Sequence, residues 1–171
     1  QEAGNLIGGA FAKWLADKKG KAVTELRIGI GHDSRITADS LYQAAAMGMV
    51  AVGAKVFYCG LVSTPSMFMT TVFEEFTFDG AIMITASHLP FNRNGYKFFD
   101  CDGGLEHDDI TAILEKASEL TYTEADLSEV EKVDSISVYC NFLQDKIRKS
   151  IQADNYEKPL EGLHVVVDTG N

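Results

Sequence analysis

The chain has 171 residues, of which 46% are hydrophobic and 23% charged, a composition typical of a globular domain with a core of ordinary size. Its 25 acidic residues outnumber its 15 basic ones, which gives a formal net charge of -10. This balance argues against nucleic acid or an anionic membrane as the main partner, although a local basic site could still bind an anionic small molecule.

No apolar run approaches the roughly 20 residues that span a bilayer, and the sequence does not open on a basic and then apolar signal segment. The cysteines, Cys59, Cys101 and Cys140, are three in number and have no CxxC spacing. We therefore expect reduced thiols in a cytoplasmic protein, and no metal site built on them.

Helices and strands are predicted to alternate through the first hundred residues. Apolar residues at helical spacing predict a helix over 5–19, with Gly20 as its C-terminal stop. A short apolar run ending in glycine predicts a buried strand over 26–31. Composition and capping residues predict helices over 37–53 and 64–76, and further short apolar runs predict strands over 54–60, 79–85 and 95–100.

The C-terminal third is more polar. Its predicted elements are a turn and acidic-started helix over 102–120, a polar connection over 121–135, a helix over 136–152 and a strand over 163–168. Strands that alternate with helices at this spacing predict an α/β layer fold with a largely parallel sheet and right-handed crossovers.

The stretch TASHLPFNRNGYKFF, residues 85–99, follows the buried strand predicted over 79–85. Ligand sites in open α/β sheets gather at the carboxyl ends of strands. Gly95 permits a backbone bend in this loop. Polar and basic side chains that could hold a phosphate, together with backbone N–H groups, crowd into it: Thr85, Ser87, His88, Asn92, Arg93, Asn94 and Lys97.

Simpler interpretations exist for each of these groups. Ser87 and His88 could only cap or hydrate a loop, and a serine hydrolase is disfavoured because the sequence lacks a GxSxG elbow and an obvious third member. Asp33 and Arg35, after the first predicted strand, are expected to pair and to order their own loop. The turn over 60–65 is expected to start a helix and to contribute through backbone groups.

Three segments, in this order, resemble the first domain of the α-D-phosphohexomutases, the family of phosphoglucomutases, phosphomannomutases and phosphoglucosamine mutases. GIGHDSRITADSL is similar to the family pattern G-R-D-x-R, GLVSTPSM to G-x-x-x-T-P, and ITASHLPFNRNGYKFF to [ST]-A-S-H-N-P followed by N-G-x-K. The resemblance covers roughly residues 5–100. It departs at His32, where the family usually has Arg, and at Leu89, where it usually has Asn.

The resemblance implies a layered α/β/α domain with a mixed, largely parallel sheet, and an intramolecular phosphotransferase. Ser87 would carry the phosphoryl group that moves between the 1- and 6-positions of a hexose phosphate, glucose or mannose phosphate first, through a hexose bisphosphate. Lys97 would supply positive charge beside Ser87. Thr85, His88 and Asn94 would belong to the active-site loop; for His88 both catalysis and ordering of the loop stay open, and we favour ordering.

The resemblance further implies a Mg²⁺ ion bound through the phosphate on Ser87, with its other ligands in a second domain. Residues 1–157 would form domain I without its N-terminal strand, and residues 158–171 would be the truncated start of domain II. The chain alone is then expected to be inactive, because phosphoserine and sugar phosphate repel each other without the metal and further cations. The alternatives are a phosphoglucosamine mutase and, because of Leu89, a catalytically silent sugar-phosphate-binding or regulatory homologue. The sequence indicates no oligomeric state.

Overall fold

The structure, a computed structural model, describes residues 1–168. The chain forms two compact units, Gln1–Ile136 and Ser137–Asn171. The first unit contains every residue that the sequence singles out as a candidate site. None of the helices within residues 1–168 combines the length and the apolar character needed to cross a bilayer.

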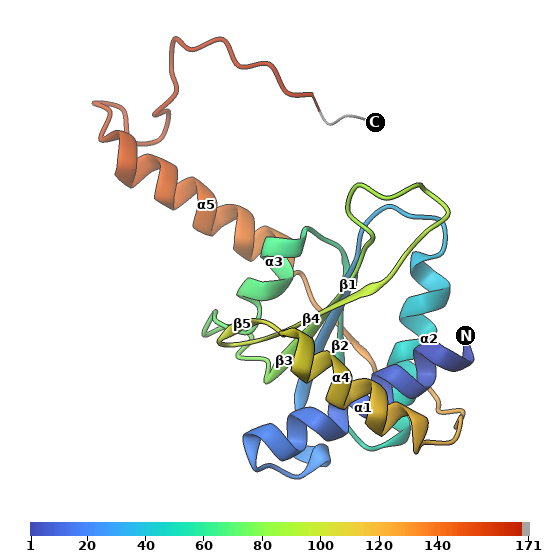
Figure 1. Ribbon diagram of the computed structural model, residues 1–171. Helices are drawn as coiled ribbons and strands as arrows, with labels where there is room; N and C mark the ends of the chain where they lie inside the picture. The colour runs from blue at the N-terminus through green and yellow to red at the C-terminus, as the bar shows by residue number, and fades with distance from the viewer. Residues whose placement is uncertain (169–171) are drawn as a thin grey trace. The chain divides into compact units, whose positions relative to one another are not determined.

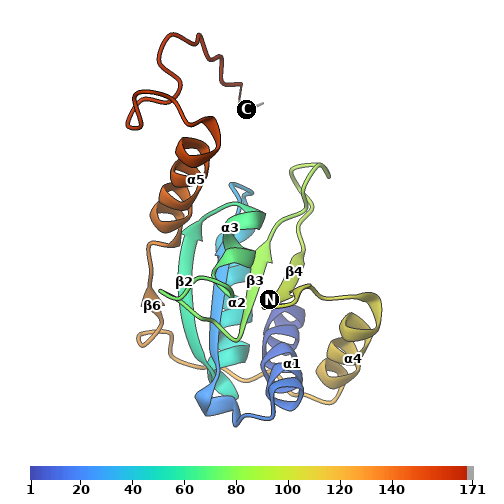
Figure 2. The ribbon, with the colours of Figure 1, turned by 90° about the vertical axis from the view of Figure 1, so that its left-hand side faces the viewer.

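Within the described residues, the first unit is built on a six-stranded sheet with the strand order β5-β4-β3-β1-β2-β6, of which β1 to β5 are labelled in Figure 1 and β6 in Figure 2. β1 pairs in parallel with β2 and β3, and β2 in parallel with β6. β4 is antiparallel to β3 and to β5, so the sheet is mixed and largely parallel, as predicted. The strands are β1 (Arg27–His32), β2 (Lys55–Leu61), β3 (Gly80–Ile84), β4 (Tyr96–Asp100), β5 (Gly103–Gly104) and β6 (Glu131–Lys132).

Helices cover both faces of this sheet (Figures 1 and 2). Side chains alternate along a strand, so Ile28 and Ile30 of β1 share one face, where they join the core formed with α1, α2 and α4. On the opposite face, a Cβ at Gly29 or Gly31 would meet Met67 of α3. The helices of the first unit are α1 (Glu2–Lys19), α2 (Ala38–Ala51), α3 (Thr64–Met69) and α4 (His107–Ser118), with a 3-10 turn, η1 (Val23–Glu25). Helix α5 (Ser135–Ile151) belongs almost wholly to the second unit.

Helix α3 is shorter than the helix predicted over 64–76. It ends at Met69, and the hydroxyls of Thr70 and Thr71 donate to the carbonyl oxygens of Met67 and Phe68, each at 2.7 Å. Threonine side chains that bond to nearby carbonyls in this way compete with the continuation of a helix.

Residues 163–168, predicted as a strand, have no regular secondary structure. A strand is stabilised by hydrogen bonds to a neighbouring strand, and a run of β-branched residues does not supply that neighbour. Val165, Val166 and Val167 are accordingly 61%, 80% and 79% exposed. The expectation that these residues begin a second domain stays a prediction.

Helices α1 and α2 approach each other closely because glycines lie where they meet. A Cβ on Gly8 would collide with the carbonyl group of Ala45, and a Cβ on Gly48 would collide with the carbonyl group of Asn5. Glycine in a helix interior costs about 0.5–1 kcal/mol relative to alanine. The close contact between the two helices explains why glycine occupies these positions.

We expect Gly48→Ala to lower the free energy of unfolding by about 1–3 kcal/mol, because overpacking outweighs the gain in helix propensity. Denaturant unfolding followed by circular dichroism measures the change. Gly104→Ala is the matched control: its added Cβ would make only ordinary contacts with Phe99, so stability should hardly change. Wild-type stability of Gly48→Ala would contradict the close approach of α1 and α2.

Candidate active site

Three loops leave the same edge of the sheet because of the register of β1. His32 ends β1 and pairs with Leu61 of β2 and Ile84 of β3, which are the last residues of their own strands. Parallel strands that end in register release their chains at a common carboxyl edge, the usual place for a ligand site. The loops that start there are residues 33–37, 62–63 and 85–95.

Asp33 and Arg35 form an ion pair in the first of these loops. The Nε of Arg35 donates to Oδ2 of Asp33 at 3.2 Å, and the backbone N–H of Arg35 donates to Oδ1 at 3.1 Å. The same Oδ2 accepts a hydrogen bond from Oγ1 of Thr85 at 2.7 Å. Asp33 therefore connects the loop after β1 to the loop after β3.

The guanidinium of Arg35 extends this connection over residues 87–93 of the 85–95 loop, which lies beside the loop after β1 (Figure 1). Its two Nη groups donate to four backbone carbonyls, those of Ser87 (2.6 Å), Leu89 (2.8 Å), Pro90 (2.8 Å) and Arg93 (3.0 Å). Together with Nε, these bonds use all five N–H donors that a guanidinium has. The pair predicted to order its own loop thus also binds a second one.

Ser87 adopts a left-handed backbone conformation with φ of 52°. The sequence allows a bend at Gly95, but Gly95 does not have a positive φ, and the left-handed residue of this loop is Ser87. The N–H of Ser87 donates to Oγ1 of Thr85 at 3.0 Å, and its carbonyl accepts from Arg35. The Ser87 residue is exposed, so its hydroxyl is accessible to a ligand.

His88 and Asn94 complete the loop. Nδ1 of His88 lies 3.3 Å from Oγ of Ser87, so these adjacent side chains face each other. Within the described residues no carboxylate binds His88, and the pair does not form a Ser-His-carboxylate triad. Oδ1 of Asn94 accepts from the N–H of Gly95 at 3.0 Å, while Nδ2 donates to Oγ1 of Thr37 at 3.2 Å.

Lys97 lies on β4, on the strand that returns from the loop. It pairs with Met83 of β3, so the two side chains share a face of the sheet. Lys97 and Arg93 are exposed, and neither takes part in an ion pair with any of residues 1–168. Two cations, one in the loop of Ser87 and one on the strand that follows it, thus have no ion-pair partner in the described part of the chain.

These residues do not form a metal site by themselves. Residues 1–168 contain no group of three or more His, Cys, Asp and Glu side chains that could hold a metal ion. The carboxylate of Asp33, in the loop next to Ser87, is already bound by Arg35 and Thr85. Within residues 1–168, a metal ion held at Ser87 would therefore need further ligands, which the family resemblance places in a second domain.

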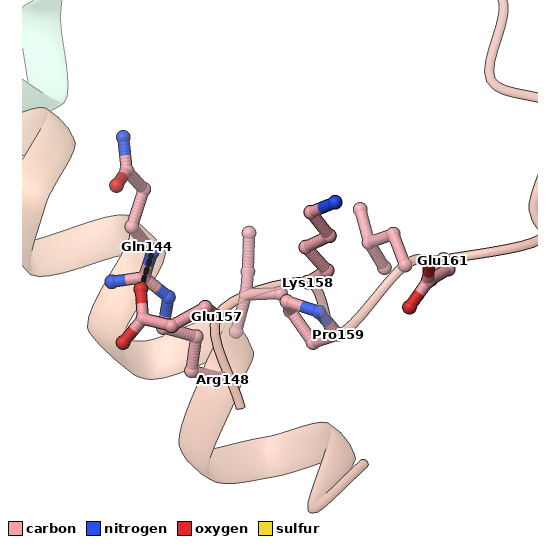
Figure 3. Close-up of a pocket in the computed structure, with 8 residues that line it drawn as sticks. Gln144, Arg148, Glu157, Lys158, Pro159 and Glu161 are labelled. Carbon is pink, nitrogen blue, oxygen red and sulfur yellow. Dashed lines mark ion pairs between the residues drawn. The ribbon is translucent and has the colours of Figure 1, made fainter. Parts of the chain in front are cut away.

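A cavity of about 590 Å³ lies in the second unit, between α5 and the segment 157–161 (Figure 3). Arg148, one of the two cations that line it, is paired with Glu157 at 3.0 Å. None of the residues that the sequence singled out lines this cavity, and we assign it no chemistry.

The sequence model of a known protein family, described as phosphoglucomutase/phosphomannomutase, alpha/beta/alpha domain I, matches residues 2–124. The chain belongs to this family. A phosphoglucosamine mutase of Caldicellulosiruptor bescii is 32% identical over 152 residues, which are 85% of this chain and 32% of that relative. One of Bifidobacterium animalis subsp. lactis is 33% identical over 170 residues, 96% of this chain and 36% of the relative. The chain spans about a third of the length of these curated relatives.

Solved structures agree with the fold. The crystal structure of a phosphoglucomutase/phosphomannomutase family protein from Burkholderia thailandensis matches with a TM-score of 0.69 and 22% identity, over 89% of this chain and 32% of that one. The phosphohexomutase family and the layered α/β/α fold predicted from three loops are thus confirmed. The expected boundary between domains I and II at residues 157 and 158 stays a prediction.

The structure shows the contacts of His32 and Leu89, the two residues that depart from the phosphohexomutase patterns. Nδ1 of His32 donates to the carbonyl oxygen of Asp33 at 2.7 Å, and Nε2 lies 2.7 Å from the hydroxyl of Tyr58. The side chain of Leu89 makes no hydrogen bond, but its carbonyl accepts from Arg35. The contact between Arg35 and this position therefore does not require the asparagine that is usual in the family.

The three cysteines of this phosphohexomutase domain are free thiols, but their environments differ. Cys59 on β2 is buried, whereas Cys101 and Cys140 are exposed. Burial raises the pKa of the Cys59 thiol to about 11. Only a thiolate reacts readily with disulfide reagents, so Cys59 should be inert near neutral pH.

At pH 8 we expect two of the three thiols to react rapidly with dithionitrobenzoate and the third to react only after denaturation, as measured by the absorbance of the released thiolate. Cys59→Ser is the control and should keep both fast-reacting thiols while losing the slow one. Three fast thiols in the folded wild-type chain would contradict the burial of Cys59.

Proposed function

We propose that this chain is the part of a phosphohexomutase that carries the phosphoryl group, with Ser87 as the carrier. The observation that most strongly supports the proposal is the state of Ser87. It is exposed at the carboxyl edge of the sheet, while the side chains of Thr85 and Arg35 bind its backbone on both sides. A serine that must present one oxygen repeatedly to a substrate benefits from such a fixed backbone.

In the proposed reaction, phosphorylated Ser87 transfers its phosphoryl group to the free hydroxyl of a hexose phosphate. The bond between phosphorus and Oγ breaks as a bond to the sugar oxygen forms, and the hydroxyl proton passes to Oγ of Ser87. The resulting hexose bisphosphate turns over and returns its other phosphate to Ser87, which yields the isomeric monophosphate. This chemistry depends on in-line positioning and on cations that offset the charge of the oxygens.

Lys97 and Arg93 are the cations of this chain that suit the second requirement, because both are exposed and unpaired within residues 1–168. Mg²⁺ remains part of the proposal, with the phosphate on Ser87 as one ligand and the other ligands from outside the described residues. We also propose a cytoplasmic setting, which the reduced cysteines support.

The relatives favour one class of substrate. Both relatives at 32% and 33% identity are phosphoglucosamine mutases, so we place glucosamine phosphate first, ahead of the glucose and mannose phosphates expected from the sequence. A silent sugar-phosphate-binding homologue is the second candidate, and its only support is Leu89. Turnover of the three sugar phosphates, measured with a bisphosphate activator, separates these possibilities.

In a protein of the relatives' full length that contains this chain, we expect Ser87→Ala to abolish phosphoryl transfer without unfolding the domain. The variant removes the carrier oxygen, and Ser118→Ala, at an exposed serine of α4, is the matched control that should keep wild-type turnover. Isomerisation rates and phosphopeptide mass spectrometry are the measurements. Near-normal turnover of Ser87→Ala would rule out the assignment.

Lys97→Met keeps most of the aliphatic stem and removes the charge. We expect it to lower kcat by about 10²-fold, the usual effect of losing one positioned electrostatic group. Steady-state kinetics in the same full-length protein measure the effect, with Lys55→Met, at an exposed lysine at the start of β2, as the control that stays active. An unchanged kcat would return Lys97 to the role of a solvated surface residue.

A further inference from the structure

We infer that Arg35 is a positioning residue for Ser87, and that it acts together with Asp33 and Thr85 as a clamp, here called the Ser87 clamp. The geometric part of this inference stands on the described contacts alone. Its consequence for phosphoryl transfer rests on the proposed function.

The clamp binds both backbone polar groups of Ser87. Oγ1 of Thr85 accepts the Ser87 N–H at 3.0 Å, and Nη2 of Arg35 donates to the Ser87 carbonyl at 2.6 Å. These two side chains bind the same oxygen, Oδ2 of Asp33, at 2.7 Å and 3.2 Å. A closed path of hydrogen bonds therefore encloses the Ser87 backbone and connects two loops.

These hydrogen bonds offset the cost of the left-handed backbone conformation of Ser87. A non-glycine residue in the left-handed region costs roughly 1–2 kcal/mol, and such strain persists only where the surroundings impose it. Two hydrogen bonds from side chains to the backbone of Ser87 contribute a net free energy of the same order as this cost, so they can hold the residue in that conformation. Without them, the loop should relax toward conformations in which Ser87 has a negative φ.

Arginine is required at position 35 because of the number and geometry of its donors. Its planar guanidinium donates to Asp33 and to four carbonyls spread over residues 87–93, whereas a lysine has three donors on a single nitrogen. The Arg35 side chain is only 11% exposed, although the loop residues whose carbonyls it binds are themselves exposed. Lysine would keep the charge and lose most of the contacts.

The clamp also changes the electrostatics of the loop. Four carbonyl oxygens, each with partial negative charge, are turned to the guanidinium rather than left to repel an incoming phosphate. The positive charge that neutralises them is fixed beside the backbone of the carrier residue. Arg35 thus positions Ser87, while Lys97 and Arg93 stay available to the ligand.

Hydrogen–deuterium exchange of the 171-residue chain tests the clamp. We expect Arg35→Lys to speed exchange of the amides in residues 86–94 at least about tenfold, with exchange in β1 and β3 unchanged. Arg27→Lys, at the opposite end of β1 and stacked on Phe57, is the matched control and should leave the loop unchanged. Unchanged loop exchange in Arg35→Lys, or equal acceleration throughout the sheet, would overturn the inference.

A second pair of variants covers the case in which Arg35→Lys does not fold. Thr85→Ser keeps the hydroxyl and should retain wild-type exchange in the loop, whereas Thr85→Val removes the hydroxyl and should speed it. The same loop exchange in both variants would show that the hydroxyl does not hold Ser87, and would overturn the clamp.

The functional consequence is a separation of kcat from KM. In a protein of the relatives' full length, Arg35→Lys should lower kcat about 10²-fold and change KM for the sugar phosphate less than about twofold, because the carrier is displaced while the substrate contacts remain. An unchanged kcat would overturn the positioning role. An active Ser87→Ala variant would instead refute the proposed function and leave the exchange result intact.

Discussion

The parallel pairing of β1 with two neighbours is the constraint on which the candidate site depends. Because His32 ends opposite Leu61 and Ile84, the three loops must start at one edge of the sheet. The alternation along β1 fixes this register: the isoleucines face the layer of α1, α2 and α4, and the glycines make room for α3. A slip of one residue would exchange the two faces and expose the isoleucines to the wrong layer.

The adjacency of the loops allows the cations to serve different purposes. The guanidinium of Arg35 binds one carboxylate and four backbone carbonyls of the chain itself, whereas Lys97 and Arg93 are exposed and unpaired within residues 1–168. A chain with a formal net charge of -10 can therefore present unpaired cations on the 85–95 loop and on the strand that follows it. The described residues supply an exposed serine and the contacts that hold its backbone, but no cluster of metal-ligating side chains.

Most of the secondary structure followed from local patterns. Helical spacing of apolar residues predicted α1 and α5, an alanine- and methionine-rich run with an N-cap predicted α2, and an acidic start predicted α4. Short apolar runs predicted β1 to β4. The patterns failed where the deciding partner is distant or absent. The two-residue strands β5 and β6 are too short to carry a period, and the valines after residue 163 do not form a strand without a neighbour.

By itself, the sequence determined the α/β class, the family and the position of the candidate loop, because three short motifs in a fixed order are local features of the chain. The tertiary structure alone decided how that loop is held. It placed the left-handed bend at Ser87 rather than at Gly95, and it brought Arg35 to carbonyls that lie 52 to 58 residues further along the chain. No local pattern specifies which carbonyls a guanidinium reaches, because that choice depends on the register of the strands that bring the two loops together.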